Sequence, residues 1–200
     1  MSNQFLDLIQ NRRTIYAVGK AVEQSPEYLT DLIQNAIKQS PSSFNSQSSR
    51  AVILFNEEHE KFWGFVKEKL KSYAKDEASA AKTSAKMDSF AAGLGTVLFF
   101  EEMDTVAELQ EKYAAYAENF PIWAEHSTAI AQFAVWTALH TEGLGANLQH
   151  YNPIVDEQVH NEWNVPASWK LRAQLVFGSK EGEAFDKSYI DDATRFKVYK

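Results

Sequence analysis

Two adjacent arginines followed by a hydroxyl residue form the first candidate site. Arg12, Arg13 and Thr14 stand in the segment NRRTIY, residues 11–16. Two guanidinium groups offer forked N–H donors to several oxygens of one phosphate, and the threonine hydroxyl adds another donor. Arginines are also typical of a helix C-terminus, where they stabilise the helix dipole and stay in water. The segment therefore indicates either a phosphate site or a solvated helix end.

A second candidate is the polar segment SPSSFNSQSSR, residues 40–50. It joins a predicted helix to a predicted strand, a connection that usually needs only about 2–6 residues. The amides of Asn45 and Gln47 each carry a donor and an acceptor, which suits the edge of a flat heteroaromatic ligand with imide and carbonyl groups. An ordinary Asn/Ser turn has the same composition. Both interpretations remain open at this point.

The third candidate is the segment EGLGANLQHYNP, residues 142–153. Gly143 and Gly145 would let the backbone approach a planar ligand closely. A glycine that ends a helix before an ordinary loop explains the same residues. The segment matches neither the dinucleotide fingerprint G-x-G-x-x-G nor a Walker loop.

Side chains that could perform chemistry by themselves are not arranged for it. The sequence has no Cys and five His, and it has neither an H-E-x-x-H pair nor a G-x-S-x-G elbow. We therefore predict no metal site and no catalytic side chain, so that an enzymatic activity would rely on a cofactor. The histidines are His59, His126, His140, His150 and His160.

Composition limits the class of protein. A chain of 200 residues with 44% hydrophobic residues can bury the core of one domain, which we predict to span residues 1–200. The net charge of -7 disfavours binding to nucleic acid or anionic lipid. The lack of Cys, of an apolar signal segment and of a membrane-spanning run predicts a soluble, cytoplasmic protein.

Apolar residues spaced three and four positions apart predict several helices. The first is capped by Ser2 and ends at the arginine pair, and the others lie at 25–40, 62–73, 106–116 and 126–145. The helix at 126–145 is apolar on nearly every face, so it must be central or lie between subunits. Residues 75–93 have few large apolar groups, which predicts an exposed or mobile helical segment.

Short apolar runs at 51–55, 96–101 and 171–178 predict strands, and the run at 51–55 is typical of a strand covered on both faces. Residues 194–199 alternate apolar and basic side chains, which predicts a half-exposed edge strand. Together the elements predict a three-layer fold of the α/β or α+β class.

The order of four motifs resembles the nitroreductase family of flavoproteins. NRRTIY, PSSFNSQ, EGLGANLQHYNP and RFKVY follow one another from the first helix to the last residues. The sequence is similar to the compact branch that includes fungal fatty-acid-regulated homologues and the copper-induced nitroreductase of lactic-acid bacteria. The resemblance implies an α+β fold with a mostly antiparallel central sheet flanked by helices. It also implies a homodimer with two FMN molecules at the interface and C-terminal segments that exchange between subunits.

The resemblance also implies roles for particular residues. Arg12, Arg13 and Thr14 would bind the FMN phosphate, Asn45 and Gln47 would contact the ribityl chain or the polar edge of the ring, and the backbone of His150 would donate an N–H to flavin N5. The full implied set of cofactor-binding residues is Arg12, Arg13, Thr14, Tyr16, Asn45, Gln47, Leu148, Gln149, His150, Tyr151, Arg195 and Lys197.

Three features depart from the family pattern. Tyr16 stands where many relatives have another arginine, so Arg195 and Lys197 would carry more of the phosphate site. Ser48 and Ser49 replace the frequent Pro-Trp pair. Residues 75–93 give little sign of the usual substrate-covering helix.

The implied activity is the transfer of hydride from NADH or NADPH through flavin N5 to a nitroaromatic or a quinone. The alternative is a stress-response protein that binds flavin with little or no turnover. No motif selects between the two nicotinamide cofactors.

Overall fold

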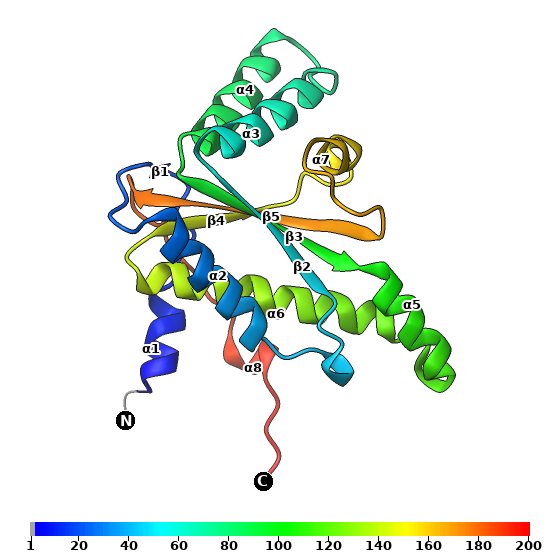
Figure 1. Ribbon diagram of the computed structural model, residues 1–200. Coiled ribbons are helices and arrows are strands. Elements are labelled where there is room, and N and C mark those ends of the chain that lie inside the picture. The colour runs from blue at the N-terminus through cyan, green and yellow to red at the C-terminus, as the bar shows by residue number, and fades with distance from the viewer. Residues whose placement is uncertain (1–2) are drawn as a thin grey trace.

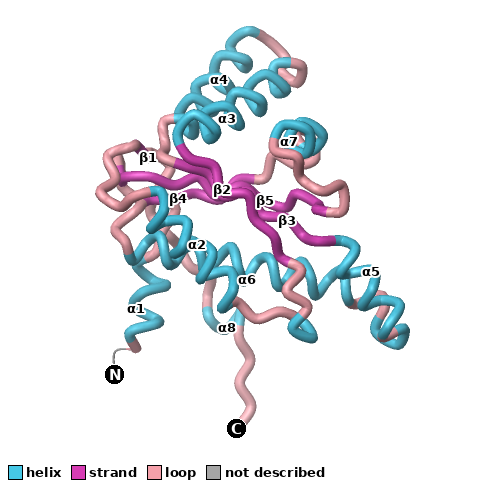
Figure 2. The backbone as a smooth tube through the Cα atoms, viewed as in Figure 1, coloured by secondary structure: helices cyan, strands magenta, loops and turns pink. Residues whose placement is uncertain are grey.

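The computed structural model describes residues 3–200, which form a five-stranded antiparallel sheet with helices on both faces (Figures 1 and 2). The strand order is β1-β5-β3-β2, and β4 also pairs with β5. The strands are β1 (Val18–Gly19), β2 (Ser49–Phe55), β3 (Gly95–Glu102), β4 (Gly145–Gln149) and β5 (Trp169–Lys180). This arrangement confirms the predicted α+β fold of three layers.

The helices divide between the two faces of the sheet (Figure 1). One face carries α3 (Asn56–Lys71), α4 (Glu77–Ala91) and α7 (Asp156–Glu162). The other carries α2 (Pro26–Gln39) and α6 (Phe120–Thr141), with α1 (Gln4–Asn11) and α8 (Asp192–Arg195) beyond α6. The remaining helices are α5 (Met103–Lys112) and two 3-10 turns, Ser43–Asn45 and Ala114–Tyr116.

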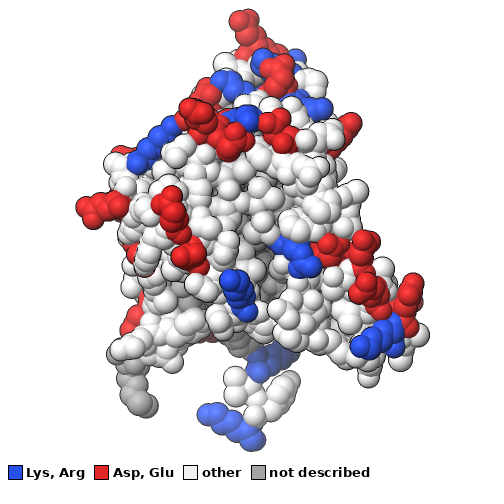
Figure 3. Space-filling model, viewed as in Figure 1, with Lys and Arg blue, Asp and Glu red and all other residues white. Residues whose placement is uncertain are grey.

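The sheet separates two apolar cores, because its side chains alternate between faces. Leu98 and Phe100 pack toward α3, whereas Val97 and Phe99 pack toward α2 and α6. On the face drawn in Figure 3, charged side chains of both signs gather over α3, α4 and the end of α5, and few lie over α2 and α6. Within residues 3–200, no helix has the length and apolar character needed to cross a membrane.

The helix α6 begins at Phe120, six residues before the predicted start, and ends at Thr141 before Gly143, which has a φ of 81°. The predicted cap of the first helix, Ser2, lies outside the described residues, and Asn3 instead accepts hydrogen bonds from the N–H groups of Phe5 and Leu6.

One strand prediction was wrong. Residues 194–199 are not a strand, since they form the end of α8 followed by an exposed segment with no hydrogen-bonded strand partner among residues 3–200. An alternating pattern needs a neighbouring strand to become part of a sheet. The strand β2 lies at the sheet edge and is nevertheless covered on both faces, as predicted. Val52 and Leu54 pack into the core on the α3 side, whereas Ala51, Ile53 and Phe55 pack against the core on the α2 and α6 side.

The prediction of an exposed or mobile helical segment at residues 75–93 was wrong in part. They form the helix α4, as the helical prediction required, but Met87 and Phe90 are each only 1% exposed. The ring of Phe90 lies 4.8 Å from that of Trp63 on α3. Two large side chains therefore suffice to fix α4 on the protein, although most of its other residues are small or charged.

We expect Phe90→Ala to lower the free energy of unfolding by about 3–5 kcal/mol, because it leaves a cavity beside Trp63. Equilibrium unfolding in urea measures this change. Lys82→Ala, on the exposed side of the same helix, should stay within about 0.5 kcal/mol of the wild type. Equal stability of the two variants would show that α4 is not held by this contact.

A buried histidine makes stability depend on pH. Nδ1 of His59 lies 2.8 Å from Oγ1 of Thr96, which also accepts a hydrogen bond from Trp63. Burial lowers the pKa of His59 to about 4, whereas a histidine in an unfolded chain has a pKa of about 6.5. Between these values the unfolded state binds more protons, so the free energy of unfolding falls as the pH is lowered through this window.

We expect His59→Leu to remove this contribution, which amounts to about 2–3 kcal/mol between pH 7 and pH 4. Urea unfolding at a series of pH values measures it. His126→Gln, at an exposed position of α6, should keep the wild-type dependence of the unfolding free energy on pH. If His59→Leu showed the same pH dependence as the wild type, His59 would not be its cause.

Candidate functional site

The first and third motifs meet through their backbones. The chain leaves α1 at Asn11, and Thr14 then forms a parallel bridge with Ala146 of β4. The N–H of Ile15 donates to the carbonyl of Ala146 at 2.9 Å, and the amide of Asn147 donates to the carbonyl of Ile15 at 3.0 Å. The segment NRRTIY therefore runs beside β4 and is joined to it by backbone hydrogen bonds.

β4 is a strand where the sequence indicated a glycine-ended helix followed by a loop. Its side chains Asn147 and Gln149 are buried, and Gln149 donates to Asn147 Oδ1 at 2.9 Å. Hydrophobic patterning misses such a strand because the buried positions are polar and satisfy one another by hydrogen bonds.

Arg12 is a half-buried cation with unused donors. Its guanidinium carbon lies 4.3 Å from the centre of the Trp136 ring and 5.8 Å from that of Phe133, both on α6. Its Nε and Nη1 are buried and have no hydrogen-bond partner. Burial, together with the nearby charge of Arg13, lowers the pKa of Arg12, but a guanidinium stays protonated in proteins. Buried donors of this kind suit an anionic ligand, since an unsatisfied charged group is costly.

Arg12 and Arg13 line a cavity of about 310 Å³. Arg13 donates to the carbonyl of Phe185, and the rings of Tyr16 and Phe185 lie 5.7 Å apart. No sequence motif marks the chain after β5, which forms part of this wall. The lining residues are Arg12, Arg13, Thr14, Tyr16, Phe185, Asp186 and Lys187.

The loop with the second motif holds strained backbone. Phe44, Asn45 and Gln47 have positive φ angles of 56°, 51° and 50°, a conformation that costs a residue with a side chain about 1 kcal/mol. The N–H of Gln47 donates to Ser42 Oγ at 2.9 Å. Both Asn45 and Gln47 are exposed, so their amides are available to a ligand.

The loop and the arginine cavity lie on different sides of α6. Gln47 lines a smaller cavity of about 130 Å³ together with Ser127 and Ala131 of α6. Trp136, which faces Arg12, follows Ser127 by nine residues, or about two and a half turns, and therefore points to the opposite face of the helix. Within one chain the structure does not bring these two predicted parts of a site together.

The residues at the end of β4 and directly after it lie in different surroundings. Leu148 is half-buried and His150 is exposed. Tyr151 is half-buried, its N–H donates to Gln174 Oε1 at 2.7 Å, and its ring lies 5.7 Å from that of Trp63. The side chain of Tyr151 thus belongs to the core beneath α3 and α4.

Arg195 and Lys197 lie in an exposed C-terminal segment that extends away from the sheet (Figure 1). The guanidinium of Arg195 lies 5.4 Å from the ring centre of its neighbour Phe196. Within the chain, neither residue lines the cavity that contains Arg12 and Arg13.

The antiparallel sheet with helices on both faces is the fold of a nitroreductase-type protein. The nitroreductase family profile matches residues 9–179, and the chain belongs to this family.

Three relatives illustrate the similarity. Nitroreductase CinD from Lactococcus lactis, solved in complex with nicotinic acid, is 50% identical with a TM-score of 0.90, over 98% of this chain and 100% of that one. Further CinD structures hold chloramphenicol and 4-nitrophenol. From Saccharomyces cerevisiae, HBN1 is 37% identical over 93% of each chain. The nitroreductase FRM2 of the same yeast is 33% identical over 96% of this chain and 95% of its own.

Proposed function

We propose that this chain, acting as a single domain of residues 1–200, is an FMN-dependent oxidoreductase. It would take hydride from NADH or NADPH and pass it to a nitroaromatic or a quinone. The observation that carries the proposal is the guanidinium of Arg12, whose buried Nε and Nη1 have no partner beside a cavity of about 310 Å³. A bound FMN would supply the chemistry at its N5 position, which accepts and returns hydride.

The chain would bind the flavin phosphate through the arginine cavity. Arg12, Arg13 and Thr14 supply forked donors and a hydroxyl, and Trp136 stacks on Arg12 and fixes the plane of its guanidinium. Tyr16 would form the wall of the cavity, where an aromatic ring stands in place of another cation.

The ring of the flavin would lie along β4 and the loop. Leu148, Gln149 and the backbone of His150 would pack against the flavin and offer an N–H to N5. The exposed amides of Asn45 and Gln47 would contact the ribityl chain or the polar edge of the ring. Tyr151 would contribute through its backbone, because its ring packs against Trp63.

We further propose that two copies of the chain share each flavin. The outer face of α6 exposes Ile122, Ile130 and Phe133 by 54%, 43% and 38%. A second copy would cover this apolar surface and would bring its loop to the arginine cavity of the first. The exposed C-terminal segment would reach across the partner and carry Arg195 and Lys197 to the phosphate.

The relatives favour a small aromatic oxidant. Nicotinic acid, chloramphenicol and 4-nitrophenol were bound in CinD, and flat rings of this kind suit a site built around another flat ring.

The absorption spectrum tests the function directly. Purified protein should be yellow, NADH or NADPH should bleach the flavin band, and a nitroaromatic or a quinone should restore it. A colourless protein that ignores added FMN would exclude the proposal. Colour without turnover would instead favour the alternative, a stress-response protein that binds flavin but scarcely reduces substrates.

We expect Arg12→Ala/Arg13→Ala to weaken FMN binding by about 100-fold or more, because each lost charge-assisted hydrogen bond contributes about 1.5–3 kcal/mol. Quenching of FMN fluorescence measures the Kd, with Lys82→Ala as the control. Urea unfolding without FMN checks the fold. A loss of stability that accounts for the whole loss of binding would favour a purely structural role for the arginines.

Mixed dimers test whether the site is shared. One variant carries Arg12→Ala/Arg13→Ala and the other Asn45→Ala/Gln47→Ala, and each alone should bind FMN poorly. After unfolding and refolding in equal amounts, about a quarter of the sites should be intact if each needs both subunits. FMN titration counts these sites. No recovered sites in a sample with proven mixed dimers would contradict the shared arrangement.

A further inference from the structure

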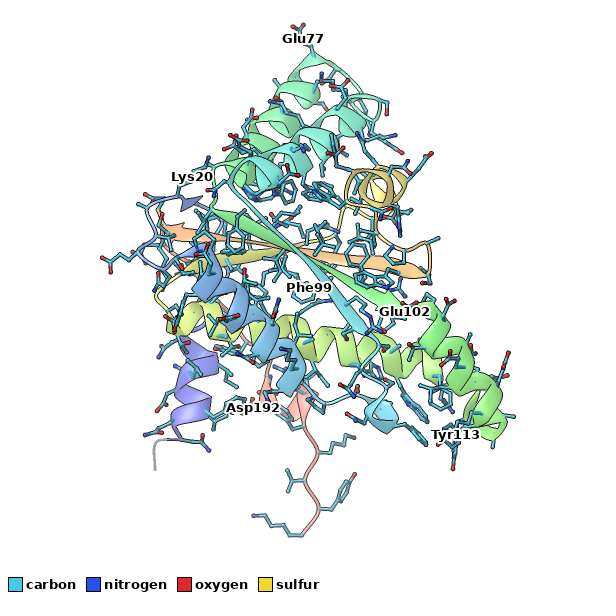
Figure 4. The ribbon with its side chains drawn as sticks, in the orientation of Figure 1. Lys20, Glu77, Phe99, Glu102, Tyr113 and Asp192 are labelled. Carbon is cyan, nitrogen blue, oxygen red and sulfur yellow. The ribbon has the colours of Figure 1, made fainter. Side chains whose placement is uncertain are left out.

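A buried acidic side chain lies behind the strained loop. Glu101, near the end of β3, is 0% exposed and stands directly opposite Ser49 in the antiparallel pairing of β2 with β3. In Figure 4, Glu102 marks this end of β3, where α5 begins, and Phe99 lies further along the strand. Glu101 shares the strand face of Phe99, because alternate residues point the same way.

The carboxyl group is linked to the end of the loop by the hydroxyl group of Ser49. Ser49 Oγ donates to Glu101 Oε1 at 3.2 Å and lies 3.3 Å from Thr128 Oγ1 on α6. Ser48 is also 0% exposed, and its carbonyl accepts the N–H of Glu102 at 2.9 Å. The loop therefore ends in two serines that are packed against β3 and α6, in the place where the family frequently has Pro-Trp.

Charged groups from the neighbouring strands act on Glu101. A register shift between Phe99 and Phe100 leaves Arg172 of β5 without a paired residue, and such bulges redirect side chains. Arg172 forms an ion pair with Glu125 of α6. Burial raises the pKa of Glu101, although Ser48, Ser49, Arg172 and Arg50 lower it.

The loop 42–49 needs contacts that hold its backbone in place. Phe44, Asn45 and Gln47 have positive φ angles, and strained backbone persists only where the surrounding structure holds it. On one side Ser42 Oγ accepts the N–H of Gln47. On the other side the chain enters the buried cluster directly after Gln47.

We propose that Glu101 is a positioning residue whose buried carboxyl group, through the hydroxyl of Ser49, holds the loop 42–49 in the turn that presents Asn45 and Gln47 to the ligand. The role in ligand binding rests on the proposed flavin site. The role in holding the turn does not. Glu101 does not itself contact the ligand, and Gln at this position would preserve the arrangement.

Hydrogen exchange tests the turn without any ligand. Glu101→Ala should speed exchange of the amides in residues 42–48 by about tenfold or more, while those of β3 residues 95–99 keep their protection. Glu101→Gln should exchange like the wild type, since its amide oxygen can accept the hydrogen bond from Ser49. Glu108→Ala, which removes a carboxylate from an exposed position of α5, is the control.

The outcomes separate the two roles. Wild-type exchange in Glu101→Ala would overturn the proposal, and so would equally fast exchange in Glu101→Gln. If Glu101→Ala does not fold, Ser49→Ala removes the hydroxyl contact and should by itself give the faster exchange.

FMN titration adds the second readout, the Kd for the flavin. Its Kd should rise about tenfold in Glu101→Ala and stay within about threefold in Glu101→Gln. A wild type that binds no FMN would reject the flavin site and leave the exchange result to decide the role of Glu101.

Discussion

The position of α6 is the constraint on which the rest of the structure depends. Its 22 residues include Val135 and Leu139, fully buried against the sheet, and the apolar Ile130 and Phe133 on the outside. A helix that is apolar all round needs cover on every side. The sheet, α2 and α1 supply part of it, and Ile130 and Phe133 stay exposed on the outer face. The same helix separates the arginine cavity from the loop with Asn45 and Gln47.

A few backbone hydrogen bonds decide where the basic side chains stand. Ile15 and Ala146 pair at 2.9 Å, and this contact lays the chain after α1 along β4. Because β4 is itself paired with β5, the arginines are attached to the central sheet through a rigid ladder. Arg12 then lies on Trp136, so both the sheet and α6 orient its guanidinium.

Buried polar groups have two different roles in this protein. Around Arg12 two buried guanidinium nitrogens have no partner, and the same residue lines a cavity, an arrangement that suits an anion. Around Glu101 the polar groups are enclosed by β2, β3 and α6, and their effect is to hold a turn. The unexpected pair Ser48 and Ser49 makes sense in this light, since a hydroxyl cluster packs where a larger apolar side chain is frequent.

The sequence by itself determined the layers, the core strands β3 and β5, the family and the residue types able to bind a phosphate. These depend on periodicity and on short motifs, which are local. It did not reveal β4, because the buried side chains of this strand, Asn147 and Gln149, are polar. It also did not reveal that Phe90 is buried, or that Glu101 is a buried acidic residue at the end of an apolar run. Only the tertiary structure decided that Thr14 lies beside Ala146, that residues 194–199 have no strand partner within the chain, and that the loop and the arginines lie on opposite faces of α6. Pairing and burial join residues far apart in the chain, so no local pattern contains them.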